Sequence, residues 1–320
     1  MAKFLILKQY IDKNKYRNFT NQFAKKQSRT LVKSDIDNLD SDEQIIKYMN
    51  VLLPTKTKTK YYKAQLDNPP RQTTPRNIEL YKTEIDSKGM SIVSTIEDGV
   101  FYKADGEYSD IFDVCRDYNI NVEPIKVSNT VYKIIVIGNV PYDSPDIPDG
   151  GLYLRVEIDY KEAKSDWESY LLVSYQKYLE GDYNIARLLA FVSFESLIRY
   201  CRNEVKNIVD SIQVKDAKLA DLIVLEDINR SLGNEHMRLI NKLEELLDIF
   251  YVFNSQGDKN YQDEKKSIVA KFKKLERFRN KVAHGKNKFT QDNNYKEFLD
   301  TLIIMNNFIS LILFEDSETK

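Results

Sequence analysis

The sequence predicts an α+β N-terminal domain over residues 1–150, followed by an all-α helical bundle over residues 161–316. Two proline-containing stretches, residues 67–76 and 141–151, are typical of loops because proline lacks a backbone donor. Strand-like segments lie between them. After residue 161 the apolar residues follow helical spacing. A chain of 320 residues is long enough for two domains.

The strand signals of the first half lie between the two loops. Residues 91–96 and 100–103 flank Asp98-Gly99, a pair typical of hairpin turns, so we expect a β-hairpin there. Residues 131–140 have the continuous apolar character of a buried strand.

Two further elements are predicted for the first half. Residues 152–158 alternate apolar and other side chains, as a half-buried strand does, and residues 109–118 suggest a short helix. Residues 1–160 contain no clustered His or Cys and no glycine-rich phosphate loop, so chemistry in this half is the weaker alternative. We expect it to be a sensor or regulatory domain.

The formal net charge of −1 is an average over opposite segments. Residues 1–80 contain 16 basic and 8 acidic residues, whereas residues 81–160 contain 7 basic and 15 acidic residues. These segments either pair their charges within one compact domain or present opposite faces. The overall balance therefore does not exclude a nucleic-acid partner.

Histidine and cysteine are scarce, with two of each, at positions 236 and 284 and at positions 115 and 201. Neither a C-x-x-C nor an H-x-x-x-H spacing occurs, so we expect no His/Cys metal centre and no cofactor, while a carboxylate-held Mg²⁺ stays open. Isolated cysteines suit a reducing compartment. The chain lacks an apolar run of 18 residues and a signal-peptide core, so we expect a cytoplasmic protein without a membrane partner.

Helical spacing of apolar residues marks five segments of the second half. They are a first helix from Trp167 that Gly181 ends, a second from Tyr183 and three stripes over residues 240–250, 268–282 and 295–314. The last segment is apolar almost all round and therefore needs more than one packing partner. We expect a second subunit to be one of them.

The most basic stretch is residues 265–288, with ten Lys or Arg and a single acid. Its apolar stripe places one face in the core, so the basic face must be exposed. Clustered positive charge suits a polyphosphate backbone. We expect Lys274, Arg277, Lys281 and Lys286 to contact RNA.

Within this stretch, residues 279–285 read RNKVAHG. They resemble the R-x(4–6)-H signature of the HEPN superfamily, in the R-N-x-x-x-H form of its Apea-like, abortive-infection branch. The resemblance covers about residues 161–316. It implies a helical bundle, metal-independent endoribonuclease activity and a homodimer or higher oligomer in which two motifs line one cleft. It also implies a role in phage defence or toxin-like growth arrest, with a phage-derived trigger.

The residue types suit RNA cleavage without a metal, because RNA carries its own nucleophile, the 2′-OH. His284 can exchange a proton near neutral pH, Arg279 can hold the phosphate and Asn280 can orient the phosphate or the imidazole. The expected products are a 2′,3′-cyclic phosphate and a 5′-hydroxyl. In an ideal helix Arg279 and His284 lie about 140° apart, so they converge only if the helix ends or distorts at Gly285 or the arginine reaches round.

Alternative pairs fit the same spacing. Arg230 with His236, and Arg277 with His284, also match R-x(4–6)-H, but without the Asn and Gly neighbours. We expect His236 to be a loop residue. The second half could also be a non-catalytic RNA-binding or dimerisation module.

Two other positions bear on the resemblance. Glu195, on the second helix, is either a polar residue beside the motif or the partner of Arg199 in an i,i+4 surface pair. Lys286 stands where HEPN toxins controlled by a nucleotidyltransferase carry Tyr, which argues against that control.

Overall fold

The computed structural model consists of two compact units: Met1–Pro54 together with Lys164–Lys320, and Thr55–Ala163. It describes residues 2–11, 13–24, 36, 38–63, 76–78, 83–84, 90–104, 107–110, 119–126, 132–140, 152–212, 218–254, 259–283 and 296–312. The first unit is helical and the second contains the strands. The mixed α and β character and the all-helical C-terminal region agree with the prediction. Residues 1–54 were expected to belong to the N-terminal domain of residues 1–150, but they are part of the helical unit.

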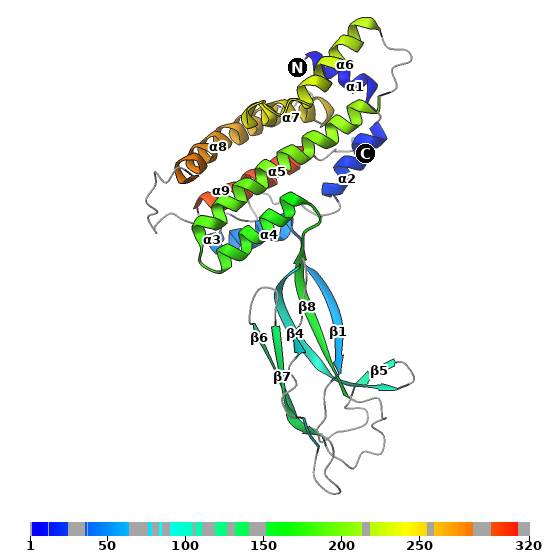
Figure 1. Ribbon diagram of the computed structural model, residues 1–320, viewed down its shortest axis with the longest axis vertical. Coiled ribbons are helices and arrows are strands. Elements are labelled where there is room, and N and C mark those ends of the chain that lie inside the picture. Colours follow the sequence, from blue (N-terminus) through cyan, green and yellow to red (C-terminus); the bar gives the residue numbers. More distant parts are fainter. Residues whose placement is uncertain are drawn as a thin grey trace. The chain divides into compact units, whose positions relative to one another are not determined.

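Helices of the helical unit come from both ends of the chain (Figure 1). They are α1 (Ala2–Tyr10), α2 (Lys13–Ala24), α3 (Ser41–Leu52), α4 (Asp166–Leu179), α5 (Tyr183–Asp210), α6 (Leu219–Leu232), α7 (Leu239–Asn254), α8 (Lys259–Ala283) and α9 (Lys296–Ile312). The longest, α5, packs against α2, α4, α6, α7, α8 and α9. The predicted second helix is therefore the centre of the bundle.

Aromatic side chains explain why the N-terminal helices join this bundle. Tyr16 of α2 stacks on Phe253 of α7 with ring centroids 4.4 Å apart. Lys8 of α1 donates a hydrogen bond of 2.7 Å to the carbonyl of Val252. These contacts join residues more than 230 positions apart, and burying such rings stabilises the packing. Local sequence patterns carry no information on a pairing at this distance.

The centre of the bundle is also aromatic. Phe194 of α5 contacts Phe272 of α8 and Phe308 of α9, each with ring centroids 5.6 Å apart. Phe250 of α7 contacts Phe308 at 5.9 Å. All four rings are fully buried. This cluster fixes α5, α7, α8 and α9 against one another and so sets the position of the basic helix.

The terminal helix α9 is apolar on several sides, as predicted, but its partners lie within the chain. It packs against α3, α5, α7 and α8. Phe298, Ile304 and Ile309 are all buried. The contacts within the chain already cover these side chains, so the composition of α9 does not require the second subunit that we expected from the sequence.

Helix ends near the predicted positions have clear local causes. Glu168 of α4 accepts hydrogen bonds of 2.8 Å from the backbone N–H groups of Lys164 and Ser165, which stabilises the start of that helix. Gly181 has a φ of +79°, a conformation that favours glycine, and it lies just after the end of α4. Asp182 then caps the start of α5.

The second unit contains antiparallel strands in two sheets (Figure 1). They are β1 (Lys56–Lys63), β2 (Arg76–Ile78), β3 (Thr83–Glu84), β4 (Met90–Ala104), β5 (Glu107–Asp110), β6 (Asn119–Lys126), β7 (Tyr132–Val140) and β8 (Leu152–Glu162). One sheet has the order β1-β8-β4-β5; in the other, β7 pairs with β2, β3 and β6. The strands predicted over residues 131–140 and 152–158 are confirmed as β7 and β8.

The hairpin predicted at Asp98-Gly99 is wrong, because β4 continues through both residues and pairs with β8 on either side. The register shifts between Glu97 and Gly99, so the pair forms an irregularity within one strand. The short helix expected over residues 109–118 is also wrong at its start, where residues 109–110 belong to β5. Its remainder lies outside the described residues.

Candidate functional site

Two faces of α8 divide the predicted site residues. Lys274, Arg277 and Lys281 are spaced by three and four residues and lie on one exposed face. Arg279 lies about 160° round the helix from the middle of that face. It therefore points towards the bundle, where α5 packs. The expected arginine and the expected RNA-contacting cations do not share a face.

Arg279 is held at the contact between α8 and α5. Its Nη2 atom lies 3.6 Å from Oε2 of Glu195, and its guanidinium carbon lies 5.2 Å from the ring centroid of Phe191. Its Nε is buried and has no hydrogen-bond partner among the described residues. The side chain keeps 31% of its exposure. The guanidinium is therefore positioned by one charge and one ring, and it remains open to a further acceptor.

Glu195 connects two arginines. Its Oε1 accepts a hydrogen bond of 2.8 Å from Arg199, one turn along α5, and its Oε2 faces Arg279. Both expectations for this residue therefore hold: it forms the i,i+4 pair, and it lies beside the arginine of the motif. The carboxylate of Glu195 lies between α5 and α8, and its negative charge stabilises the guanidinium of Arg279 in this position.

Some cations of α8 form ion pairs with acidic residues, whereas the exposed cations near its end do not. Lys265 forms an ion pair with Asp248, and Lys273 lies 3.5 Å from Glu244, so acidic residues of α7 neutralise part of the basic run. Within the described ranges, Lys274, Arg277 and Lys281 have no ion pair. The accessible positive charge is thus concentrated towards the end of the helix.

The described part of the motif ends with α8. Asn280 is exposed, and α8 is described as far as Ala283. His284, Gly285 and Lys286 lie outside the described residues. Arg279 and Asn280 are thus the motif residues whose surroundings are known.

The alternative pair of Arg230 and His236 does not form a comparable site. Arg230 is 74% exposed and lies near Glu226 and Asp227 of its own helix. His236 is exposed in the connection between α6 and α7, where its backbone N–H donates to the side chain of Asn234. The prediction that His236 is a loop residue is confirmed.

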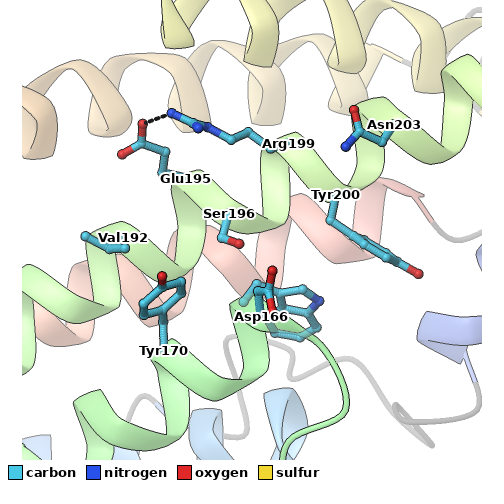
Figure 2. A pocket seen from close by; sticks show the side chains of 9 residues that line it. Asp166, Tyr170, Val192, Glu195, Ser196, Arg199, Tyr200 and Asn203 are labelled. Atoms are coloured by element: carbon cyan, nitrogen blue, oxygen red, sulfur yellow. Dashed lines mark hydrogen bonds and ion pairs between the residues drawn. The ribbon is translucent and has the colours of Figure 1, made fainter. Parts of the chain in front are cut away.

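A cavity of about 500 Å³ lies between α4 and α5 next to Glu195 (Figure 2). Tyr170 and Asp166 rise from α4 on one side, and Ser196, Glu195 and Arg199 belong to α5 on the other. The Tyr170 side chain is 42% exposed. We call this space the aromatic cavity, because Trp167, Tyr170 and Tyr200 line it.

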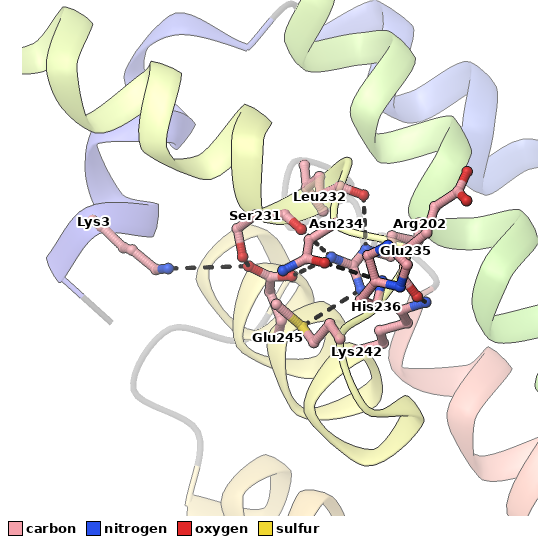
Figure 3. A network of polar contacts seen from close by, with 10 residues as sticks. Lys3, Arg202, Ser231, Leu232, Asn234, Glu235, His236, Lys242 and Glu245 are labelled. Atoms are coloured by element: carbon pink, nitrogen blue, oxygen red, sulfur yellow. Dashed lines mark hydrogen bonds and ion pairs between the residues drawn. The ribbon is translucent and has the colours of Figure 1, made fainter.

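A network of polar contacts farther along α5 was not predicted (Figure 3). Arg202 is 3% exposed; it donates to the carbonyl of Leu232 at 2.9 Å and to that of Ser231, and it lies 3.3 Å from Glu245. Burial lowers the pKa of Arg202, and Glu245 opposes that effect. A sequence signal existed, because Arg199, Arg202 and Lys206 follow an i, i+3, i+7 spacing along one face of α5.

No cluster of three His, Cys, Asp or Glu side chains that could hold a metal ion occurs among the described residues. Within the same residues, no helix combines the length and the apolar character needed to cross a membrane. No protein-family model matches the chain, and no curated protein and no solved structure is significantly similar to it.

Proposed function

We propose that the chain is a metal-independent endoribonuclease of the HEPN type, with Arg279, Asn280 and His284 as its catalytic residues. The observation that carries this proposal is the placement of Arg279. Its guanidinium is positioned by Glu195 and Phe191 while 31% of the side chain remains exposed, so its accessible N–H groups can bind a phosphate oxygen.

The proposed reaction uses the nucleophile of the RNA itself. The 2′ oxygen attacks the adjacent phosphorus while His284 takes up its proton. Arg279 stabilises the charge that builds on the non-bridging oxygens, and Asn280 orients the phosphate. The bond from phosphorus to the 5′ oxygen breaks and that oxygen receives a proton, which gives a 2′,3′-cyclic phosphate and a 5′-hydroxyl.

A second copy of the chain supplies the acid in this proposal. One histidine cannot easily act as base and acid in the same step, and two motifs facing one cleft remove that difficulty. The test is dominance: an excess of inactive His284→Ala chains mixed with wild-type chains should suppress cleavage, because a mixed dimer keeps only one of the two histidines. If the protein is active as a monomer in light scattering, this part of the proposal fails.

The activity is tested with purified protein and single-stranded RNA in EDTA. We expect cleavage by the wild type, and a loss of about 100-fold or more in His284→Ala. The matched control is His236→Ala, which removes the other histidine of the chain and should cleave normally. Cleavage that EDTA abolishes, or that His284→Ala leaves unchanged, would contradict the proposal.

A second candidate function is a non-catalytic RNA-binding module. The exposed cations Lys274, Arg277 and Lys281 favour it, because they suffice for phosphate contacts without chemistry. It predicts salt-sensitive RNA binding without turnover, and a silent His284→Ala variant. The catalytic proposal predicts growth arrest on expression of the wild type that His284→Ala relieves.

The biological context of the proposed nuclease is phage defence or toxin-like growth arrest, in the cytoplasm, with a phage-derived trigger. The HEPN-like motif supports this context. Infecting cells that express the wild type or His284→Ala tests it. Equal phage yields from both would contradict a defence role while leaving the nuclease activity to the cleavage assay.

A further inference from the structure

A second cavity lies on the other side of Arg199, between α5 and the connection from α6 to α7. It measures about 590 Å³. Four cations line it, Arg199, Arg202, Lys206 and Lys242, whereas Glu235 is the one carboxylate of its described lining. We call it the cationic cavity. His236, far from the HEPN-like motif in sequence, also lines it (Figure 3).

Three of these cations already have carboxylate partners, but Lys242 does not. Arg199 pairs with Glu195, Arg202 with Glu245 and Lys206 with Asp210. Lys242 is 9% exposed, and its ammonium donates 2.8 Å to the carbonyl oxygen of Glu235. No carboxylate of the described residues lies within ion-pairing distance of it. A buried ammonium without a counter-charge is costly unless an anion accompanies it.

The electrostatics of the cavity agree with this deficit. Burial lowers the pKa of Lys242, and the charges of Arg202 and Arg199 lower it further, whereas Glu235 and Glu195 oppose this lowering to a smaller extent. A bound anion would add to the effect of these two carboxylates. Several donors lining one cavity suit a phosphoryl group, which offers several acceptor oxygens.

The cationic cavity adjoins the aromatic cavity, because Arg199 and Asn203 line both. The aromatic cavity offers the face of Tyr170 to a flat ring, and its acids, Asp166 and Glu195, repel a phosphate but accept hydrogen bonds from amino or hydroxyl groups. One cavity therefore suits an anionic group and the other suits an aromatic ring.

We propose that these two adjoining cavities bind a nucleotide, with its phosphates at Lys206 and Lys242 and its base against Tyr170. The site uses none of the three proposed catalytic residues, and it does not depend on the proposed cleavage. The nucleotide comes either from solution or from a single-stranded RNA, since both offer the same base and phosphate.

Calorimetry on the full chain with ADP and with pyrophosphate tests the proposal. Lys242→Gln should weaken both ligands about tenfold, because it removes a charge-assisted contact. Lys206→Gln changes a more exposed side chain and should weaken both in the same direction, which guards against misfolding of the buried variant. The matched control is Arg230→Gln, an exposed cation that does not line either cavity.

The base is tested separately. Tyr170→Ala should weaken ADP about tenfold and leave pyrophosphate binding unchanged, because only the nucleotide has a ring to stack. A 2′-O-methyl hexanucleotide, which lacks the attacking hydroxyl, identifies the source: tighter binding than ADP assigns the site to RNA, and weaker binding assigns it to a free nucleotide. Absence of binding for ADP and hexanucleotide, or binding that Lys242→Gln and Lys206→Gln leave unchanged, would overturn the proposal.

Discussion

Arg202 of α5 and Arg279 of α8, which contacts α5, hold their guanidinium groups in two different ways. Arg202 is almost completely buried and is satisfied by two backbone carbonyls and by Glu245. Arg279 is about one-third exposed, lies 3.6 Å from its carboxylate and has an unsatisfied Nε. The first joins helices and has nothing left to offer a ligand. The second is positioned but incompletely bonded, as a phosphate-binding group must be.

We expect the largest effect on stability from a substitution of Arg202. Arg202→Ala removes the cation that pairs with the buried Glu245 and the donor to the carbonyls of Ser231 and Leu232. We expect the free energy of unfolding to fall by about 3–5 kcal/mol. Urea unfolding measures it. A loss below about 1 kcal/mol would show that the network does not stabilise the bundle.

At Arg279 we expect the opposite result, a large loss of activity with little loss of stability. Arg279→Gln should lower the cleavage rate about 100-fold while changing the free energy of unfolding by less than about 1 kcal/mol. The two values come from RNA cleavage and urea unfolding of the same preparation. If the variant unfolds as readily as Arg202→Ala, Arg279 is a structural residue and the comparison fails.

The contrast between the two arginines also marks what sequence can predict. The helical stripes fixed the positions of α4, α5, α7, α8 and α9, because burial of one helix face leaves a local repeat. The pairing of Arg279 with Glu195 joins residues 84 positions apart on two helices, and no local repeat encodes it. The pair of Glu195 with Arg199 was predictable, because the two residues are four positions apart on one helix.

The same limit explains the errors in the first half. Asp98-Gly99 has the composition of a turn, but the pairing of β4 with β8 on both sides of it decides the outcome. The strands β4 and β5 instead pair from Ala104 and Glu107 onwards, and the sequence between these two residues, Asp105-Gly106, is a second pair of the same type that lies outside the described residues. Composition could not distinguish the two pairs, since the neighbouring strand makes the difference.

A buried lysine in the β unit extends the comparison to a cation that donates to a hydroxyl group. Lys161 is 1% exposed, its ammonium donates to Thr55 at 3.1 Å, and burial lowers its pKa to about 8. Between pH 8 and 10.5 the unfolded chain keeps a proton that the folded chain has released, so this residue makes stability rise with pH. We expect a rise on the order of 2 kcal/mol.

Thermal unfolding across this pH range measures the effect, with Lys161→Met as the reference. Tyrosines whose pKa is raised, such as Tyr200 with a pKa of about 12 through burial, oppose the rise above pH 10 in both proteins. The difference between wild type and variant isolates Lys161. Parallel curves for the two proteins would show that its ammonium is not destabilised by burial.

The smallest expected effect concerns the exposed face of α8. Replacing Lys274 and Arg277 by Gln should weaken RNA binding about tenfold and reduce the salt dependence by about 1.4 in the slope of log K against log salt, since two phosphate contacts are lost. Cleavage at saturating RNA should stay unchanged. The matched control is Lys266→Gln, an exposed cation near the start of α8 that lies 3.5 Å from Asp263. An unchanged salt slope would remove this face from the RNA interface.

The chemistry of the products tests the central claim most directly. An RNA with one cleavage position is incubated in EDTA, and the ends of both fragments are identified by mass spectrometry. Attack by the 2′-OH predicts a 2′,3′-cyclic phosphate and a 5′-hydroxyl, and a single 2′-deoxy substitution at that position should block the cut. A 5′-phosphate end, or equal cleavage of the 2′-deoxy substrate, would contradict the role assigned to Arg279 and His284.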